Sequence, residues 1–303
     1  MILQTTSYTH LYEKYNFNIH IPDFKQTMTE DELVKIIPQY DGWIIGDDPA
    51  TMKVFKNGTK LKGVVKWGVG VDNVDFQACQ KLNIPVTNTP NMFGQEVSDI
   101  AVNYLLGLAR QTFKIHENVK KGLWIKPCGE SLYNKKVCLV GFGDIGKHVA
   151  KKLLAFDMKI HVSDPFFIKD DNLNIHIQID TLDNCLTNAD YVVITCSLNK
   201  STFHLINKTN LLLCKNGVKV INVSRGSIVN ENDIIELLES GHVNSVAFDV
   251  YENEPVDINS KLLTFDKNIF GSHNSSNTKE AVDKTSERAL FLLSEFINNS
   301  LTR

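Results

Sequence analysis

The segment Val140–Gly146 carries three glycines in the spacing G-x-G-x-x-G. Each glycine has its own physical use in such a turn. Gly141 permits a tight bend, Gly143 lets a ligand approach the backbone closely, and Gly146 lets the following helix pack against the preceding strand. The segment therefore predicts a site for the pyrophosphate of a dinucleotide.

The surroundings of the glycines strengthen this interpretation. A short apolar strand, Val137–Val140, leads into them, and an amphipathic helix beginning near Lys147 leads out. Phosphates would lie at its positive end, and Asp144 and Ile145 of the turn are expected to contact the cofactor. A second strand, Lys159–Ser163, ends on Asp164. That carboxylate would accept hydrogen bonds from the adenosine ribose and repel a 2′-phosphate, and no arginine follows it. NAD is therefore expected as the cofactor rather than NADP.

Three further ionisable residues follow strand-like segments of the second half of the chain. They are Arg225, Glu254 and His273. In an open parallel sheet, ligands bind outside the carboxyl ends of the strands, so all three are expected to reach one cleft. Arginine suits a carboxylate because its planar fork forms two parallel bonds, and a histidine beside a carboxylate suits proton transfer near neutral pH.

In the order and spacing of these motifs, the chain resembles the NAD-dependent D-isomer-specific 2-hydroxyacid dehydrogenases. The resemblance spans nearly the whole chain and includes the segments Gly68–Asp75 and Asn88–Pro90. It implies an enzyme that moves a hydride between NAD and C2 of a 2-hydroxy or 2-keto acid. By the same resemblance, Arg225 binds the substrate carboxylate, His273 exchanges the hydroxyl proton, and Glu254 pairs with the imidazole.

The resemblance also implies contacts outside this trio. Asp249 would hold the nicotinamide carboxamide, and the backbone near Cys196 would line the cofactor site. Trp67, Gly68 and Val69 would contact the substrate, with backbone amides directed at its carboxylate. Trp67 is bulky for its place, and two interpretations stay open: it covers the substrate, or it packs in the core. No metal site is expected.

Strand-like and helix-like segments alternate along the chain, which predicts an α/β fold. We expect two doubly wound parallel-sheet domains, with a Rossmann nucleotide domain at 98–274 inserted into a discontinuous, flavodoxin-like substrate domain at 1–97 and 275–303. Expected strands outside the fingerprint are Ile2–Thr5, Asn18–Ile21, Gly42–Ile45, Gly63–Lys66, Pro85–Asn88, Tyr191–Cys196, Lys219–Val223 and Ser245–Asp249. Expected helices include one capped by Thr29 and Glu32, a long one at 98–121, and a last one at 278–297 capped by Thr278.

Composition limits the partners. The chain has 43% hydrophobic and 22% charged residues and a formal net charge of -3, which gives no reason to expect a nucleic-acid or membrane partner. Six cysteines show no C-x-x-C spacing, and no signal peptide is recognisable, so we expect free thiols in the cytoplasm. The expected partners are a small acid substrate and a second copy of the chain, in a dimer built around 98–121.

The identity of the substrate stays open at this stage. The loop Gly46–Pro49 carries Asp47 and Asp48, which disfavour a phosphorylated acid unless Lys66 compensates their charge. One alternative is a phosphite-type dehydrogenase; Glu254 argues against the formate enzymes, which use glutamine there. Another is an NAD-sensing, corepressor-like binding protein on the same scaffold.

Overall fold

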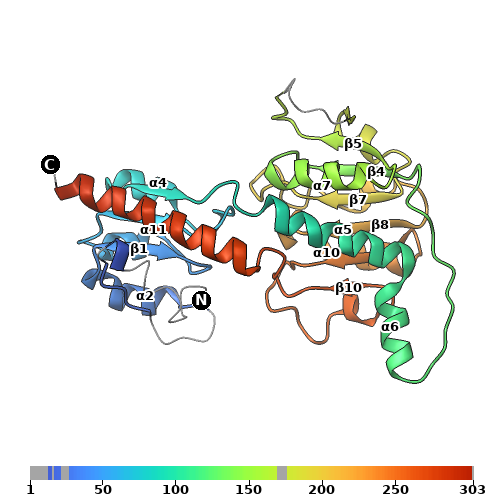
Figure 1. Ribbon diagram of the computed structural model, residues 1–303, viewed down its shortest axis with the longest axis horizontal. Coiled ribbons are helices and arrows are strands. Elements are labelled where there is room, and N and C mark those ends of the chain that lie inside the picture. Colours follow the sequence, from blue (N-terminus) through green and yellow to red (C-terminus); the bar gives the residue numbers. More distant parts are fainter. Residues whose placement is uncertain (1–12, 16, 22–26, 169–175, 302–303) are drawn as a thin grey trace. The chain divides into compact units, whose positions relative to one another are not determined.

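The computed structural model describes residues 13–15, 17–21, 27–168 and 176–301 (Figure 1). The chain divides into two compact units. Unit 1 comprises Met1–Met92 and Asn277–Arg303, and unit 2 comprises Phe93–Ser276. The boundaries between the two units therefore lie a few residues from the expected domain boundaries at 97/98 and 274/275. Each unit is an α/β fold around its own parallel sheet.

Unit 1 holds a three-stranded parallel sheet in the order β1-β2-β3. The strands are β1 Gly42–Ile45, β2 Gly63–Lys66 and β3 Val86–Asn88, and the helices are α2 Glu30–Ile36, η2 Ile37–Gln39, α3 Met52–Asn57, α4 Phe76–Lys81 and α11 Lys279–Leu301. The Thr29–Glu32 capping box is present at the start of α2, as expected. The expected strand at 18–21 is not formed, and the one at 2–5 lies outside the described residues.

Helix α11 joins unit 1 from the far end of the sequence and lies along β1 and β2 (Figure 1). Two strand glycines allow this close approach. A Cβ on Gly63 would lie 2.4 Å from Cβ of Phe296, and one on Gly42 would lie 2.9 Å from Leu293. At the start of the helix, the Thr278 hydroxyl accepts the amide of Ala281 at 3.1 Å, so the predicted cap is confirmed.

Unit 2 holds a seven-stranded sheet in the order β10-β9-β8-β7-β4-β5-β6, with every pairing parallel. The strands are β4 Lys136–Val140, β5 Lys159–Ser163, β6 Gln178–Ile179, β7 Tyr191–Ile194, β8 Val218–Asn222, β9 Val243–Phe248 and β10 Ile269–Phe270. The chain starts in the middle at β4, runs outward through β5 and β6, and returns to β7. The strand order therefore reverses between β4 and β7, which makes this the point where ligands of doubly wound sheets bind.

Unit 2 has helices on its sheet. They are α5 Gly94–Arg110, α6 Thr112–Lys120, α7 Asp144–Leu154, α8 Leu182–Leu186, α9 Lys208–Leu211, η3 Gly226–Ile228, α10 Glu231–Glu239 and η4 Lys261–Thr264. Helix α6 extends beyond the sheet (Figure 1). The prediction of a single helix at 98–121 was wrong. The helical segment begins at Gly94 and is interrupted at Gln111, which adopts a left-handed conformation (φ 53°) between α5 and α6.

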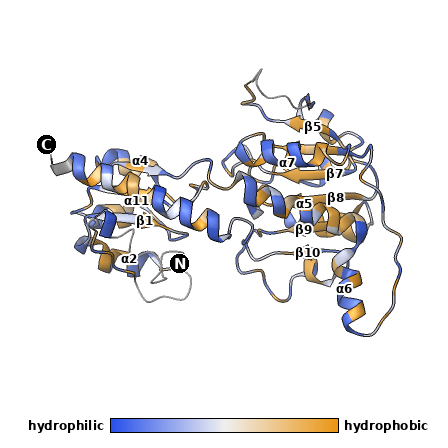
Figure 2. Ribbon diagram, in the orientation of Figure 1, coloured by the Kyte–Doolittle hydropathy of each residue, from blue (hydrophilic) through white to orange (hydrophobic). Residues whose placement is uncertain are grey.

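The hydropathy pattern follows from the two-sided burial of the unit 2 sheet. All residues of β7 and β8 are buried, as expected for strands covered by helices on both faces. Figure 2 shows hydrophobic residues concentrated in these strands, with hydrophilic residues along helices such as α7. None of the helices in the described part of the chain has an apolar stretch long enough to cross a bilayer.

The packing of α11 can be tested by truncating Leu293, which is 4% exposed. Leu293→Ala should lower the free energy of unfolding by about 2–5 kcal/mol, because it leaves a cavity above Gly42. Phe291→Ala is the matched control on the same helix, since that side chain is 39% exposed and its loss should cost about 1 kcal/mol or less. Urea unfolding measures both, and equal losses would contradict the packing described.

Candidate functional site

The glycine turn lies at the reversal point of the unit 2 sheet. Gly141 has φ +93°, and a Cβ there would lie 2.6 Å from the backbone of Cys196, which follows the neighbouring strand β7. A Cβ on Gly146 would lie 2.3 Å from the Gly141 oxygen. Gly143 differs, because nothing lies within 4 Å of its Cβ position. The turn is therefore closed where strand and helix meet and open at Gly143, which is the opening a pyrophosphate needs.

The groups expected around the cofactor gather at this turn. Gly143 is the N-cap of α7, whose first residues are Asp144 and Ile145. Asp164 follows β5 and accepts the Phe142 amide at 2.7 Å and the Phe166 amide at 2.8 Å. These bonds fix the half-exposed carboxylate beside the glycine turn. The residues present therefore fit NAD, with an open backbone for the pyrophosphate and a fixed carboxylate for the ribose.

Glu254 and His273 are brought together by loops that follow β9 and β10. The Glu254 carboxylate contacts His273 Nδ1 at 2.8 Å with one oxygen and accepts the Tyr251 amide at 3.0 Å with the other. The carboxylate is thus held in place by its own loop as well as by the imidazole. The two side chains are 33% and 39% exposed, so the pair remains accessible from solvent.

Arg225 lies near this pair. It follows β8, and its backbone oxygen accepts the Asn222 side-chain amide at 2.8 Å. The next residue, Gly226, passes so close to the 251–252 backbone that a Cβ would lie 1.8 Å from the Tyr251 carbonyl carbon. The positive charge of Arg225 acts on Glu254, which places the three predicted residues in one electrostatic environment.

The groups around Glu254 shift the pKa of its carboxyl in opposite directions. Burial is the largest single influence and would raise the pKa of the carboxyl. The hydrogen bond and charge of His273, the Tyr251 amide and the charge of Arg225 outweigh it, so the pKa lies below its ordinary value. Glu254 is therefore ionised at neutral pH. Its contribution to stability is complete above the ordinary carboxyl pKa and is lost as the pH falls through the lowered one.

Asp249, one of the expected cofactor contacts, is a buried residue at the end of β9. Its carboxylate is 1% exposed and accepts four hydrogen bonds, from the Tyr104 hydroxyl, the Asn274 amide, and both the amide and the hydroxyl of Ser275. Two oxygens offer about four lone-pair positions, and all four are used. The carboxylate is thus held between helix α5 and the turn at 273–275.

The residues expected to bind substrate in unit 1 follow β2. The Trp67 amide donates to the Ile45 oxygen at 2.8 Å, and the Gly68 amide donates to the Thr89 hydroxyl at 2.8 Å. The Trp67 indole packs against α11 and donates to the Ser286 hydroxyl at 3.2 Å, while the residue stays partly exposed. Among the described residues, the amide of Val69 donates to no group. Val69 is thus the better placed of the three to offer an amide to a ligand.

Most of the charged groups at the loop Gly46–Pro49, including Lys66, are bound by other groups of unit 1. Lys66 is 4% exposed, and its ammonium donates to the Gly46 oxygen at 2.6 Å and lies 3.4 Å from Asp47. Asp48 is buried and accepts the Met28 amide at 2.8 Å. Only Asp47 extends its carboxylate into solvent, with its side chain 78% exposed. The loop therefore presents a negative charge at its surface, and Lys66 is occupied beneath it.

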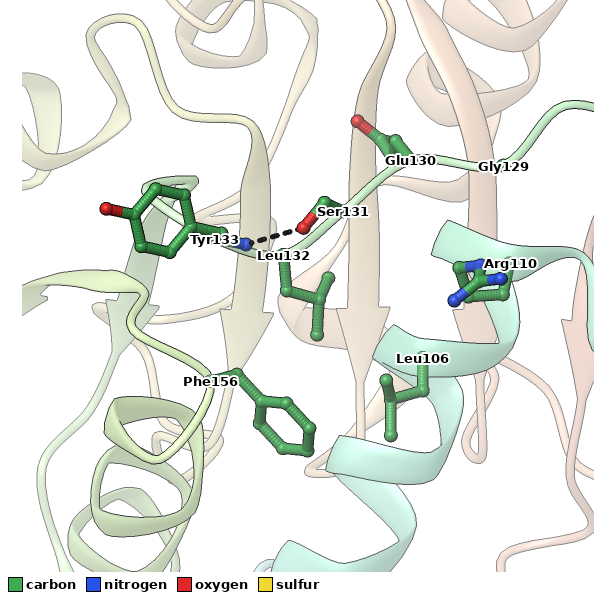
Figure 3. Close-up of a pocket in the computed structure, with 8 residues that line it drawn as sticks. All are labelled: Leu106, Arg110, Gly129, Glu130, Ser131, Leu132, Tyr133 and Phe156. Atoms are coloured by element: carbon green, nitrogen blue, oxygen red, sulfur yellow. Dashed lines mark hydrogen bonds between the residues drawn. The ribbon is translucent and has the colours of Figure 1, made fainter.

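A cavity of about 460 Å³ in unit 2 is a separate feature (Figure 3). It is lined by Leu106, Arg110, Gly129, Glu130, Ser131, Leu132, Tyr133 and Phe156. The segment 129–133 that borders it leads into the first residue of β4, so the cavity lies toward the amino ends of the strands. The glycine turn and the trio follow the carboxyl ends. The cavity is therefore not part of the candidate active site.

Comparison with known proteins assigns the chain to a family. Residues 102–275 match the family model of the D-isomer specific 2-hydroxyacid dehydrogenase NAD binding domain. The chain is 34% identical to hydroxypyruvate reductase of Thermotoga maritima over 259 residues, which cover 84% of each protein. The chain belongs to the D-isomer specific 2-hydroxyacid dehydrogenases. It is therefore an NAD-dependent oxidoreductase.

Two further comparisons refine the position of this dehydrogenase within the family. It is 35% identical to D-3-phosphoglycerate dehydrogenase of Bacillus subtilis, covering 76% of this chain but only 44% of that relative. The crystal structure of the TT0316 protein from Thermus thermophilus superposes with a TM-score of 0.87 at 25% identity, over 96% of this chain and 94% of that one. The α/β fold with two parallel-sheet domains is confirmed. These relatives do not favour the corepressor-like or phosphite-type alternatives.

Three residues of the site carried no specific expectation from the sequence. Tyr104, Gly226 and Ser275 each touch the loops that hold the trio. Tyr104 fits the apolar spacing of a helix, so nothing in the sequence indicates that its hydroxyl meets Asp249. Gly226 directly follows Arg225, and that adjacency is the only signal that could have identified it.

The open position at Gly143 generates a test that separates cofactor binding from folding. Gly143→Ala should destabilise the protein by only about 1 kcal/mol, because φ is -71° and no atom is near, whereas Ala is a poorer helix cap. The affinity for NADH should fall by about tenfold or more, because the methyl group occupies the pyrophosphate approach. Gly143→Ser restores a capping side chain and should lose affinity equally. NADH fluorescence titration measures this, and unchanged affinity would show that the pyrophosphate binds elsewhere.

Proposed function

We propose that this dehydrogenase interconverts a small, unphosphorylated D-2-hydroxy acid and its 2-keto acid. The observation that carries the proposal is the combination, in one unit, of an open glycine turn with Arg225, Glu254 and His273. One relative of matched length is a hydroxypyruvate reductase, whose name describes an unphosphorylated 2-keto acid.

The residues divide the chemistry as follows. Bound NAD supplies the hydride acceptor for oxidation, and NADH supplies the hydride for reduction. Oxidation of C2 requires the hydroxyl proton to leave, and His273 takes it; reduction returns the proton from the imidazolium to the C2 oxygen. Nδ1 is held by Glu254, so Nε2 is the nitrogen that exchanges the proton with substrate. Arg225 binds the substrate carboxylate and polarises the C2 oxygen.

We further propose that unit 2 is the NAD-binding domain and unit 1 is the substrate domain. The family model and the glycine turn both fall in unit 2. In unit 1, the proposed substrate contacts are at Trp67, Gly68 and Val69, with the Val69 amide as the donor to the carboxylate. In unit 2, the proposed cofactor contacts are Gly141, Gly143, Asp144, Ile145, Gly146, Asp164, Cys196 and Asp249.

The charges at Asp47 and Lys66 support an unphosphorylated substrate. A phosphate carries nearly two negative charges at neutral pH and would meet the exposed Asp47 carboxylate. The Lys66 ammonium is buried and already bonded to the Gly46 oxygen, so it is poorly placed to offset that repulsion.

A homodimer is part of the proposal. Large apolar side chains are exposed on α6 and on the segment that follows it, namely Phe113, Val119, Leu123, Trp124 and Tyr133, with Trp124 79% exposed. Exposed apolar side chains of this kind favour a symmetric contact with a second copy. Sedimentation equilibrium at micromolar concentration should give twice the chain mass of 34.2 kDa, and a mass of one chain would contradict the dimer.

The cysteines support a reducing, cytoplasmic environment. All six are free thiols, and Cys79, Cys138, Cys185 and Cys214 are buried. Fractionation of cells that express the protein should recover it with the soluble cytoplasmic fraction, and recovery with an extracellular or membrane fraction would contradict this location.

The role of His273 can be tested by removing its ring. His273→Ala should lower kcat by about 10²- to 10⁴-fold, because the proton transfer loses its acid and base. NADH affinity should change little, since the glycine turn is untouched. Stopped-flow turnover with NADH and fluorescence titration measure the two quantities, and turnover near the wild-type rate would remove His273 from the mechanism.

The substrate class can be tested with a panel of 2-keto acids at saturating NADH. Hydroxypyruvate and glyoxylate should give kcat/KM values at least about tenfold above phosphohydroxypyruvate, because Asp47 opposes the phosphate. Asp47→Ser should narrow that ratio mainly by improving the phosphorylated substrate. A preference for phosphohydroxypyruvate in the wild type would overturn the assignment to unphosphorylated acids.

A further inference from the structure

Asp144 brings a negative charge to the turn that is open for an anionic ligand. It is the first residue of α7 and directly follows Gly143, where nothing lies within 4 Å of the Cβ position. A carboxylate beside an anion opposes its binding, because like charges repel. Good binding of a pyrophosphate at this turn therefore requires the Asp144 side chain to point elsewhere.

The Asp144 carboxylate lies against the first residue of helix α5. A Cβ on Gly94 would lie 2.6 Å from each of its two oxygens. Within the described part of the chain, Oδ2 is shielded from solvent and accepts no hydrogen bond. The side chain as a whole is 23% exposed. The carboxylate is thus enclosed beside Gly94 rather than extended into the open approach to the turn.

The amino end of α5 offers this carboxylate a favourable electrostatic environment. The helix spans 17 residues, and its aligned peptide dipoles place partial positive charge at the first turn. The N-cap is Phe93, whose ring cannot accept the amides of that turn as a polar capping side chain would. Glu96 supplies one negative charge from within the first turn, and Asp144 supplies another from the neighbouring helix.

His148 holds Asp144 from one turn further along α7. Its Nδ1 lies 2.8 Å from the Asp144 backbone oxygen and 3.5 Å from Oδ1 of the carboxylate. A carbonyl oxygen can only accept, so Nδ1 is the donor. A Cβ on Gly94 would lie 2.5 Å from this nitrogen as well. The imidazole and the carboxylate therefore share the space that glycine leaves at position 94.

Lys152 extends the contact between the two helices by one more turn. Its ammonium donates to the Gln95 oxygen at 2.9 Å and to the Ser98 hydroxyl at 2.6 Å, and it pairs with Asp99. Residues 144, 148 and 152 recur at intervals of four and so lie on one face of α7. This face fixes α7 against the first turns of α5, and its amino end borders the cofactor turn.

We propose that His148 is a positioning residue for cofactor binding that acts through Asp144: it keeps the Asp144 carboxylate on the amino end of α5 and away from the pyrophosphate. The inference rests on the proposed cofactor contact at the glycine turn. The competing role for His148 is a purely structural link between α7 and α5, whose loss loosens the turn whatever the charge at position 144. The two roles differ in whether the effect of His148 depends on that charge.

His148→Ala should lower the affinity for NADH about 5- to 10-fold, because the released carboxylate is free to turn toward the phosphates. The kcat at saturating NADH should stay within about twofold, since the catalytic trio is untouched. His148→Asn places a side-chain donor near the position of Nδ1 and should regain the wild-type affinity to within about twofold. Lys151→Ala is the matched control, because Lys151 is exposed on the same helix, and it should keep the wild-type affinity.

A double-mutant cycle of His148→Ala and Asp144→Asn, followed by NADH fluorescence titration, tests the proposal. Asp144→Asn alone should leave the affinity unchanged or raise it by up to about threefold, because the amide carries no charge. In the Asp144→Asn protein, His148→Ala should cost no more than about twofold. A loss as large as in the wild-type background would overturn the positioning role and support the structural link. A tenfold loss in Asp144→Asn alone would also overturn it.

Two fragments of the cofactor show whether the effect depends on phosphate. ADP carries a pyrophosphate and adenosine carries none, so His148→Ala should weaken ADP by about the same factor as NADH and leave adenosine unchanged. Isothermal titration calorimetry measures both, and equal losses for the two ligands would contradict the proposal. If His148→Ala does not fold, His148→Gln replaces it in these experiments. If Gly143→Ala leaves the NADH affinity unchanged, the proposed cofactor site itself fails, which is a distinct result.

Discussion

The hydrogen bond between the Glu254 carboxylate and His273 Nδ1 is the contact on which the chemistry of the site depends. It fixes the tautomer of the imidazole and stabilises its protonated form, so that one residue can both accept and return a proton. The bond requires two loops that follow different strands to meet within 2.8 Å. The Tyr251 amide holds the Glu254 carboxylate, and the Asp249 carboxylate holds the Ser275 amide in the turn after His273. These bonds fix the positions of the two loops.

The arrangement also requires glycine at positions where a side chain would clash with neighbouring groups. Gly226 lets the Arg225 turn pass directly over the backbone near Tyr251, and Gly271 leaves room for Asp249 and Tyr104 beside the turn that carries His273. The same kind of constraint closes the cofactor turn at Gly141 and Gly146 and leaves Gly143 open. The site is thus defined as much by where side chains are absent as by the charged groups that react.

The sequence predicted strands β4, β5, β7, β8 and β9 of unit 2, the cofactor turn and the proximity of Glu254 and His273, because each depends on local pattern or on the rule that parallel strands end at one edge. The two-residue strands β6 and β10 are too short to show such a pattern. The sequence did not predict the break at Gln111, since the apolar spacing continues across it while the backbone turns left-handed. It also could not show that Trp67 packs on α11 or that Asp249 accepts hydrogen bonds from Tyr104 and Ser275. Those contacts join residues far apart in sequence, and periodicity carries no information about them.

The most direct test of the account is the pH dependence of 2-keto acid reduction by Glu254→Gln. Reduction needs protonated His273, so its rate falls as the pH rises, and loss of the neighbouring negative charge should move that falling limb to lower pH. Glu252→Gln removes a nearby carboxylate that bonds the Glu231 amide, and its limb should move far less. An unchanged limb in Glu254→Gln would show that the carboxylate does not govern the proton on His273, and the account of the site would be wrong.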